Sequence, residues 1–541
     1  MPVQSAEPQT QVHAPALLPA PVLRRGAGVA ELVVKGERLL VLGAEVHNSA
    51  ASTPESARTA FAAVADVGAN TVLAPVAWES VEPVEGVYDL TIVDDLIGAA
   101  REKGLLLVVL WFGAYKNGAS TYAPTWVKAD PARFPRCASA DGSLTGTLSP
   151  FANTTRAADA AAFAAVVEHI ETVDGAHRTV VMVQVQNEPG LLGSSRDHSP
   201  QATQLFSAAP PLEVLGAAGV ESPQESWSAA FDDLLDADEH FMAWGFATYI
   251  EAVAQAGREH SAVPFFTNAW LDSTIDLPGF SLAGGQRPGT YPSGGPVARM
   301  LPVWRALAPS LDLVVPDIYF GDFDAICESF VSASGGLFIP EMRRDAVGVG
   351  DAFVAIGQHR SIGVAPFGVD SIDDDDQRAD LRDAFELLAA LGLRAGDATQ
   401  GFHLLPDAAP ESSSELDFGD VQLRATRLVR FGETTPPAQG AFGVVVRTGP
   451  TTFLAAGRGF SLTFHDPESR RVELLEVLEH PRERPTAQGR RPVSRRLNGD
   501  ETAGGTAWLH PARLQEQSEV FPIPMSIRHT GISSCEIQRL G

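Results

Sequence analysis

The chain has little of what would indicate disulfide bonds, a membrane span or a metal centre. It has three cysteines, Cys137, Cys327 and Cys535, an odd number without metal-ligand spacing, so we expect reduced thiols. No apolar run is long enough to cross a membrane. The opening residues, M-P-V-Q-S-A-E-P-Q-T-Q-V-H-A-P, lack the basic and apolar parts of a secretory signal. These absences predict a cytoplasmic protein with no membrane partner.

Positive charge is also scarce, because 67 acidic residues outnumber 40 Lys and Arg and give a formal charge of −27. Nucleic acids are bound by clustered Lys and Arg, so this balance argues against a nucleic-acid partner. Gly348-Val349-Gly350 lacks the third glycine of a dinucleotide motif. The four aspartates at 373–376 lack the glycine and final glutamate of a calcium loop, and we expect them to cap a helix. The sequence predicts no cofactor and no metal.

The chain does contain an apolar strand that ends on a carboxylate. In residues 180–190, V-V-M-V-Q-V-Q-N-E-P-G, five of the first six residues are apolar, which predicts a strand buried on both faces. Pro189 cannot donate to a sheet, so the strand ends at Asn187 and Glu188. Residues 337–343, L-F-I-P-E-M-R, have the same pattern and reach Glu341. The carboxyl ends of buried strands are where α/β barrels carry their chemistry.

Eight strands of this kind alternate with helices. A hairpin over residues 31–42 leads into the first strand, which ends at 43–48, and the other strands are predicted at 71–78, 105–113, 180–188, 264–270, 312–319, 337–342 and 363–369. The helices are predicted at 54–67, 92–103, 156–172, 239–257, 298–307, 323–333, 352–360 and 378–391. Eight units favour a closed (β/α)₈ TIM barrel of the α/β class, with an open doubly wound sheet as the alternative.

The pattern changes near residue 395 to short alternating runs with Gly, Pro and Asp breaks, which predicts a smaller all-β, sandwich-like C-terminal domain. We therefore predict a mobile N-terminal tail at 1–28, a catalytic barrel at 29–395 and a β-rich domain at 396–541. Two segments, 114–153 and 191–238, are predicted as unusually long loops on the catalytic face of the barrel.

Carboxylates, amides and aromatic rings collect at the predicted strand ends. Carboxylates and amides bind hydroxyl groups, and tryptophan rings stack on the apolar face of a pyranose, so these residues suit a sugar. The substrate-binding candidates are Glu45, His47, Asn48, Trp78, Glu79, Trp111, Lys116, Asn187, Trp270 and Tyr319. Some have simpler interpretations: Glu45 and His47 could bond only to neighbouring strands, and Lys116 could pair with an acid.

Glu188 and Glu341, at the ends of strands four and seven, are the catalytic candidates. One carboxyl would protonate the glycosidic oxygen while the other attacks the anomeric carbon, if the two lie about 5–5.5 Å apart. Like charges at that distance raise the proton affinity of the acid. The pair therefore predicts glycosidic cleavage.

Several motifs resemble those of known retaining glycoside hydrolases. Trp78-Glu79-Ser80-Val81-Glu82-Pro83-Val84-Glu85-Gly86-Val87-Tyr88-Asp89 resembles the W-x-x-x-E-P-x-x-G-x-Y-D/N segment of β-galactosidases, and the segments at 115–118, 122–128 and 133–136 resemble a bacterial branch of glycoside hydrolase family 35 that has a β-rich C-terminal domain. The resemblance implies that Glu188 is the acid/base and Glu341 the nucleophile. It also implies that Asn187 binds the sugar 2-hydroxyl and that Tyr319 touches the nucleophile.

Three functions follow from these observations. The first is a retaining, exo-acting β-galactosidase that removes terminal β-linked galactose from an oligosaccharide by double displacement. The second is another retaining β-glycosidase, such as a xylosidase, glucosidase or arabinosidase. The third is a non-catalytic carbohydrate-binding barrel. The expected partner is an oligosaccharide or small glycoside, and a homo-oligomer is compatible with the sequence.

Overall fold

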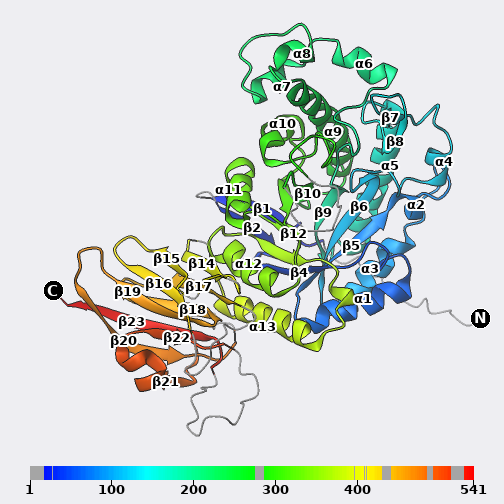
Figure 1. Ribbon diagram of the computed structural model, residues 1–541. Helices are drawn as coiled ribbons and strands as arrows, with labels where there is room; N and C mark the ends of the chain where they lie inside the picture. The colour runs from blue at the N-terminus through cyan, green and yellow to red at the C-terminus, as the bar shows by residue number, and fades with distance from the viewer. Residues whose placement is uncertain are drawn as a thin grey trace, which may run out of the picture.

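A computed structural model describes residues 17–26, 29–273, 285–394, 396–406, 408–409, 411–428, 440–483, 491–512 and 529–540. Eight parallel strands form one sheet in the order β11-β10-β9-β6-β5-β4-β13-β12 (Figure 1). A parallel bridge between Ile318 and Met342, with Ile318 N donating to the Glu341 carbonyl at 3.0 Å, joins its two ends. The predicted closed barrel is confirmed, and the open-sheet alternative is wrong. The strands are β4 (Val41–Glu45), β5 (Thr71–Ala77), β6 (Leu106–Lys116), β9 (Val180–Asn187), β10 (Phe265–Trp270), β11 (Leu313–Asp317), β12 (Ile339–Met342) and β13 (Gly363–Pro366).

Helices surround the barrel, and their ends follow local sequence signals. Thr53 and Ser56 form a capping box at the start of α1, and Gly68, at φ +74°, follows its end. Asp374 accepts hydrogen bonds from two backbone amides of α13, so the aspartate run caps a helix as predicted. No helix in the described ranges is both long and apolar enough to cross a membrane. The helices are α1 (Pro54–Asp66), α3 (Thr91–Glu102), α5 (Asn153–Asp174), α9 (Leu234–Arg258), α10 (Leu301–Leu307), α11 (Phe323–Ser334), α12 (Ala346–Gly357) and α13 (Asp375–Leu391).

A small antiparallel sheet of β1 (Val22–Gly26), β2 (Val29–Val34) and β3 (Glu37–Leu39) precedes the barrel. Apolar side chains of β2, including Leu32, pack in one cluster with residues of the barrel interior. The predicted tail at 1–28 is therefore wrong over β1, because Val22–Gly26 pairs with β2 and Leu23 packs against the same cluster. The prediction is also wrong at Leu18, whose backbone N donates to the Gly175 carbonyl at 2.9 Å. Residues 1–16 and 27–28 lie outside the described residues.

The two segments predicted as long loops contain short elements. Residues 114–153 include α4 (Thr125–Lys128) and a hairpin of β7 (Arg136–Ala138) and β8 (Leu144–Leu148). Residues 191–238 include three short helices, which lie at the top of Figure 1, far from the β-rich domain. The side chains of Ser199, Ser226 and Asp233 each cap the start of a helix in this segment. A single capping residue is a local signal, and the segment as a whole still has the polar composition that predicted a loop. The short helices are α2 (Trp78–Val81), which follows β5, and α6 (Pro200–Phe206), α7 (Leu212–Ala217) and α8 (Trp227–Ala230).

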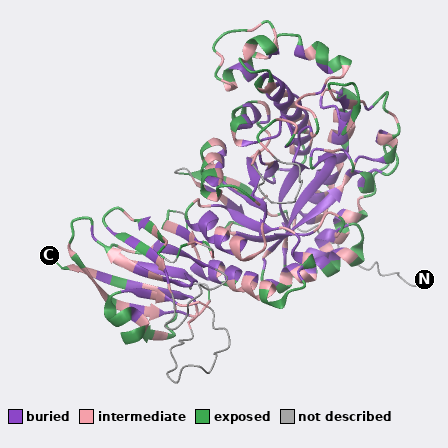
Figure 2. Ribbon diagram, in the orientation of Figure 1, coloured by how far each residue is buried: buried purple, intermediate pink, exposed green. Residues whose placement is uncertain are grey.

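The C-terminal region forms two antiparallel sheets, in the orders β14-β17-β18-β23-β20-β21 and β15-β16-β19-β22. Buried residues lie on these sheets, on the barrel strands and on the faces of the helices that pack against the barrel (Figure 2). This arrangement agrees with the predicted sandwich. The predicted domain limit at residue 395 falls between α13 and β14 and stays a prediction. The strands are β14 (Ala398–Leu404), β15 (Ser413–Asp417), β16 (Gln422–Arg427), β17 (Ala441–Arg447), β18 (Thr452–Arg458), β19 (Phe460–His465), β20 (Arg471–Glu479), β21 (Arg495–Leu497), β22 (Trp508–His510) and β23 (Ile532–Leu540).

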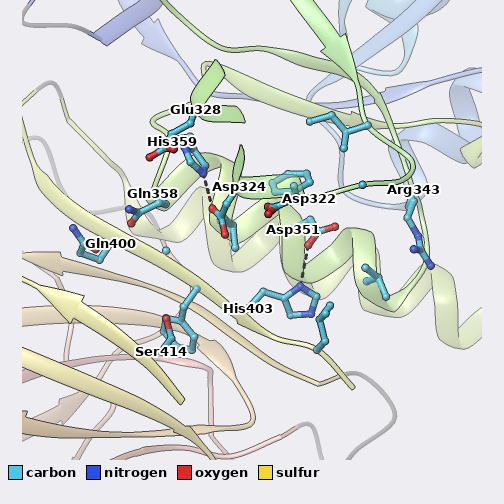
Figure 3. Close-up of a pocket in the computed structure, with 18 of the residues that line it drawn as sticks. Asp322, Asp324, Glu328, Arg343, Asp351, Gln358, His359, Gln400, His403 and Ser414 are labelled. Carbon is cyan, nitrogen blue, oxygen red and sulfur yellow. Dashed lines mark hydrogen bonds and ion pairs between the residues drawn. The ribbon is translucent and has the colours of Figure 1, made fainter. Parts of the chain in front are cut away.

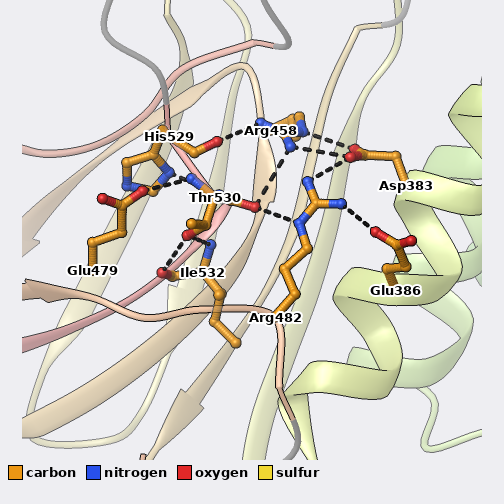
Figure 4. A network of polar contacts seen from close by, with 9 residues as sticks. Asp383, Glu386, Arg458, Glu479, Arg482, His529, Thr530 and Ile532 are labelled. Carbon is orange, nitrogen blue, oxygen red and sulfur yellow. Dashed lines mark hydrogen bonds and ion pairs between the residues drawn. The ribbon is translucent and has the colours of Figure 1, made fainter. Parts of the chain in front are cut away.

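The β-rich domain packs against α12 and α13 of the barrel. The rings of Phe353 and Phe442 lie 4.7 Å apart across this contact. Arg458 Nε donates to Asp383 at 2.8 Å, and Arg482 binds both Asp383, at 2.5 Å, and Glu386, at 2.7 Å (Figure 4). The Arg458 and Asp383 side chains are only 9% and 14% exposed, whereas Glu386 is 49% exposed. Apolar and ionic contacts together hold the β-rich domain against the barrel.

We predict that Asp383→Ala lowers the free energy of unfolding by about 3 kcal/mol, because it leaves the buried Arg458 guanidinium bonded to backbone carbonyls without its carboxylate partner. Glu386→Ala, on the same helix and bound by the same Arg482, should cost less than about 1 kcal/mol because its pair is exposed. Urea unfolding of both variants measures the difference. Equal losses would show that burial does not decide the strength of this contact.

Candidate active site

A pocket of about 550 Å³ opens at the carboxyl ends of the barrel strands. Seven of the predicted site residues line it: His47, Asn48, Lys116, Glu188, Trp270, Tyr319 and Glu341. Asn187 is fully buried and donates its amide to Glu341. The barrel thus brings together residues that are up to about 300 positions apart in the sequence, as expected for the catalytic face of this fold.

Glu188 directly follows β9, and its backbone is held in an unusual conformation. Gln186 has a φ of +65° and Glu188 a φ of +45°, values that cost residues other than glycine on the order of 1–3 kcal/mol each. Side-chain contacts hold this turn: Glu188 N donates to Asn268 Oδ1 at 2.9 Å, and Gln186 Nε2 donates to Asp159 at 2.7 Å. The strained turn fixes where the Glu188 carboxyl lies.

Glu341 lies in β12 and accepts hydrogen bonds on both oxygens. Asn187 Nδ2 donates to Oε1 at 3.0 Å, and the Tyr319 hydroxyl donates to Oε2 at 3.0 Å. Asn268 Nδ2 lies 3.4 Å from Oε1. Several donors around one carboxyl suit an ionised carboxylate, which only accepts hydrogen bonds. This oriented carboxylate is only 6% exposed.

A third carboxyl, Asp317 at the end of β11, joins the two glutamates. One oxygen from each of Glu188, Asp317 and Glu341 lies within 4.8 Å of the other two. Burial, followed by the Glu341 charge, raises the pKa of Glu188 to about 8 and raises the pKa of Asp317 well above its ordinary value. A side-chain hydrogen bond between Asp317 and Glu188 lowers the pKa of Glu188 and raises that of Asp317. Glu188, with a pKa raised to about 8, therefore lies beside Glu341, which accepts hydrogen bonds on both of its carboxyl oxygens.

Lys116 and Glu45 complete the charge distribution. Burial alone would lower the pKa of Lys116, but the surrounding carboxylates, Glu341 first, outweigh it and raise that pKa. Glu45 is only 1% exposed, and neither carboxyl oxygen has a hydrogen-bond partner among the described residues. Burial raises the pKa of Glu45 well above its ordinary value. Burial thus favours the protonated form of Glu45, which lies close to the site but does not line the pocket.

Three predicted sugar-binding residues lie away from the pocket. Trp78 is fully buried in α2, where its Nε1 donates to Glu82 at 2.8 Å. Trp111 is fully buried, and its Nε1 donates to Asp159 of α5 at 2.8 Å. Glu79 is exposed and pairs with Lys128 at 3.0 Å. Position at a strand end is therefore insufficient, because the direction of the side chain decides whether it reaches the pocket.

Asn268 and Asp317 also stand at predicted strand ends, but they were not selected as catalytic or substrate-binding candidates. A signal for both exists: each lies two positions before a selected residue, Trp270 or Tyr319, and residues two apart in a strand share a face. His47, which was selected, is held at the rim. Its Nδ1 lies 2.9 Å from Asp370 Oδ1, and its ring centre lies 5.1 Å from that of Phe367.

The three clustered carboxyls could also hold a divalent cation, because carboxylate oxygens are the ligands that Ca²⁺ and Mg²⁺ prefer. Lys116, however, interacts electrostatically with all three of them and already supplies a buried positive charge. The ammonium group competes with a cation for the same carboxylates.

Part of the chain matches known families. Residues 49–233 match the glycoside hydrolase 42 family model, described as Beta-galactosidase. The resemblance to family 35 is therefore corrected to family 42 for this part of the chain, while the β-galactosidase type is kept. Residues 381–508 match a Domain of unknown function, DUF5597. No curated protein matches the chain.

Among solved structures, the chain is similar to three β-galactosidases. The enzyme of Marinomonas ef1 is 13% identical with a TM-score of 0.45, and the matched region spans 65% of this chain and 60% of that enzyme. That of Halorubrum lacusprofundi is 16% identical with a TM-score of 0.44 (66% and 59% covered). That of Bacillus circulans sp. alkalophilus is 14% identical with a TM-score of 0.44 (65% and 56% covered). The chain thus spans less than two thirds of each of these proteins. Through residues 49–233, the barrel carries the sequence signature of a glycoside hydrolase.

Proposed function

We propose that this protein is a retaining, exo-acting glycoside hydrolase that releases terminal β-linked galactose. The observation that carries the proposal is the pairing of a protonated Glu188 with an accepting Glu341 whose oxygens lie within 4.8 Å. Retaining enzymes have carboxyls about 5–5.5 Å apart, whereas inverting enzymes need about 6.5–9.5 Å to admit a water. The β-galactosidase family model matched by residues 49–233 supports galactose as the sugar.

In the first step, Glu341 attacks the anomeric carbon and the glycosidic C–O bond breaks. Glu188 gives its proton to the departing oxygen, so the leaving group departs as a neutral alcohol and the sugar forms an ester with Glu341. In the second step, the Glu188 carboxylate takes a proton from water as that water attacks the anomeric carbon. The ester bond breaks, Glu341 is released as a carboxylate, and Glu188 is protonated again.

The surrounding residues set the proton positions for both steps. Asn187 and Tyr319 hold the Glu341 carboxylate by hydrogen bonds to separate oxygens. Asp317 donates to Glu188 and thus supports the carboxylate that Glu188 becomes after the first step. Lys116 offsets the negative charge of Glu341. Trp270 lines the pocket and offers a ring to the apolar face of the sugar.

We predict that Glu188→Gln and Glu341→Gln each lower kcat on an aryl β-galactoside by at least about 1000-fold, because each removes a group that reacts in the transition state. Glu79→Gln, on an exposed glutamate outside the pocket, is the matched control and should keep its turnover. Hydrolysis rates on a panel of aryl galactoside, xyloside, glucoside and arabinoside identify the sugar that the enzyme prefers. Near-normal turnover in either active-site variant would remove that residue from the mechanism.

We predict that kcat/KM falls as the pH rises through about 8, where Glu188 loses the proton that it must donate. The decline should approach tenfold per pH unit, and its midpoint belongs to the coupled cluster rather than to Glu188 alone. The measurement is a pH profile of kcat/KM, with circular dichroism recorded to show that the fold persists. A decline that begins near the ordinary glutamate pKa of about 4.3 would contradict a buried, protonated acid.

A further inference from the structure

A second cleft, of about 880 Å³, lies between the barrel and the β-rich domain. One wall comes from the segment after β11 and from α11 and α12, including Asp324 and Gln358. The opposite wall comes from β14 and β15, including Gln400 and Ser414. Figure 3 shows these side chains facing the space between the two domains. The cleft exists only because the β-rich domain supplies one of its walls.

The cleft adjoins the candidate active site. Tyr319 and Phe320 line both spaces, and the Tyr319 hydroxyl donates to Glu341 at 3.0 Å. Phe320 is 36% exposed and presents an aromatic ring at the junction. Tyr319 and Phe320 therefore form a boundary that the candidate active site and the cleft share.

The lining has the chemistry of a neutral-sugar site. Within the described part of the chain, the side chains of Gln358, Gln400 and Ser414 have no hydrogen-bond partner, so their donors and acceptors face solvent. Amides and hydroxyls pair with sugar hydroxyls in both directions. Two histidines in the cleft are already engaged by acids, His359 with Asp324 at 2.7 Å and His403 with Asp351 at 3.0 Å.

The charged side chains that line the cleft limit the kinds of saccharide that can bind there. The cleft is also lined by Asp322 and Glu328, and by Glu415, which pairs with Arg424 at 2.5 Å. Its arginine, Arg343, is paired with Asp345 at 2.5 Å. This excess of carboxylates repels uronic acids and phosphorylated sugars and leaves neutral saccharides as the fitting ligand.

The two walls are fixed relative to each other before any ligand binds. A Cβ placed on Gly357 of α12 would lie 2.8 Å from the Gly401 Cα of β14, so the helix and strand are in direct backbone contact. The Phe353–Phe442 contact and the Asp383–Arg458 pair hold the same interface. A preformed cleft loses little entropy on binding, which favours affinity.

We propose that the β-rich domain forms, together with the barrel, a binding site for the neutral saccharide units that extend beyond the sugar held at Glu188 and Glu341. This inference rests on the proposed glycosidase function. It gives the domain a role in selecting long substrates over short ones.

The test compares an aryl β-galactoside with a neutral tetrasaccharide that ends in β-galactose. In the double variant Gln400→Ala/Ser414→Ala, the ratio of kcat/KM for the tetrasaccharide to kcat/KM for the aryl galactoside should fall about tenfold, mainly through KM, since two hydrogen bonds are lost. Gln422→Ala is the matched control: it removes an exposed amide from the same domain, outside the cleft, and the ratio should stay unchanged.

Calorimetry separates this inference from the proposed function. Tetrasaccharide binding is measured on Glu188→Gln protein, with and without the two cleft substitutions, and should weaken about tenfold when they are present. If the wild type cleaves neither substrate but the cleft substitutions still weaken binding, the glycosidase proposal fails, while the assignment of the cleft as a saccharide-binding site is supported. An unchanged ratio together with unchanged binding would overturn the cleft assignment.

Discussion

The mutual repulsion of carboxylates within one buried site is the constraint on which the rest of the structure depends. Glu188, Asp317 and Glu341 cannot all be charged with oxygens within 4.8 Å, and burial adds to the cost of each charge. The protein resolves this conflict by an uneven distribution of protons. Hydrogen-bond donors converge on Glu341, while the pKa values of Glu188 and Asp317 are raised and Lys116 supplies a positive charge.

The barrel makes this arrangement possible because it fixes each acid from a separate strand. β9, β11 and β12 deliver Glu188, Asp317 and Glu341, and the bridge from Ile318 to Met342 closes the barrel beside them. The positive φ at Glu188 is maintained by Asn268, which also donates to Asp317 at 2.7 Å. Backbone strain and proton distribution are thus coupled through one amide side chain. The β-rich domain, packed on α12 and α13, then extends the site outward.

Much of this architecture could be predicted from the sequence, and the failures have physical causes. Apolar strands alternating with amphipathic helices predicted the eight units, and a carboxylate at the end of each of two buried strands predicted Glu188 and Glu341. Trp78 and Trp111 were misplaced because position at a strand end does not show on which face a side chain emerges. Asp317 stands at a strand end but was given no role, because its role depends on Glu188 and Glu341, which are distant from it in the sequence. The short helices α6 and α8 were missed because their only local start signal is a single capping serine.

The stereochemistry of the first product tests the central claim most directly. Proton NMR of the sugar released in the first seconds from an aryl β-galactoside distinguishes the two anomers before they interconvert. Attack by Glu341 followed by attack of water inverts the anomeric carbon twice, so the β-anomer should form first. Initial release of the α-anomer would show a single displacement by water and would contradict the close pairing of Glu188 and Glu341 as acid and nucleophile.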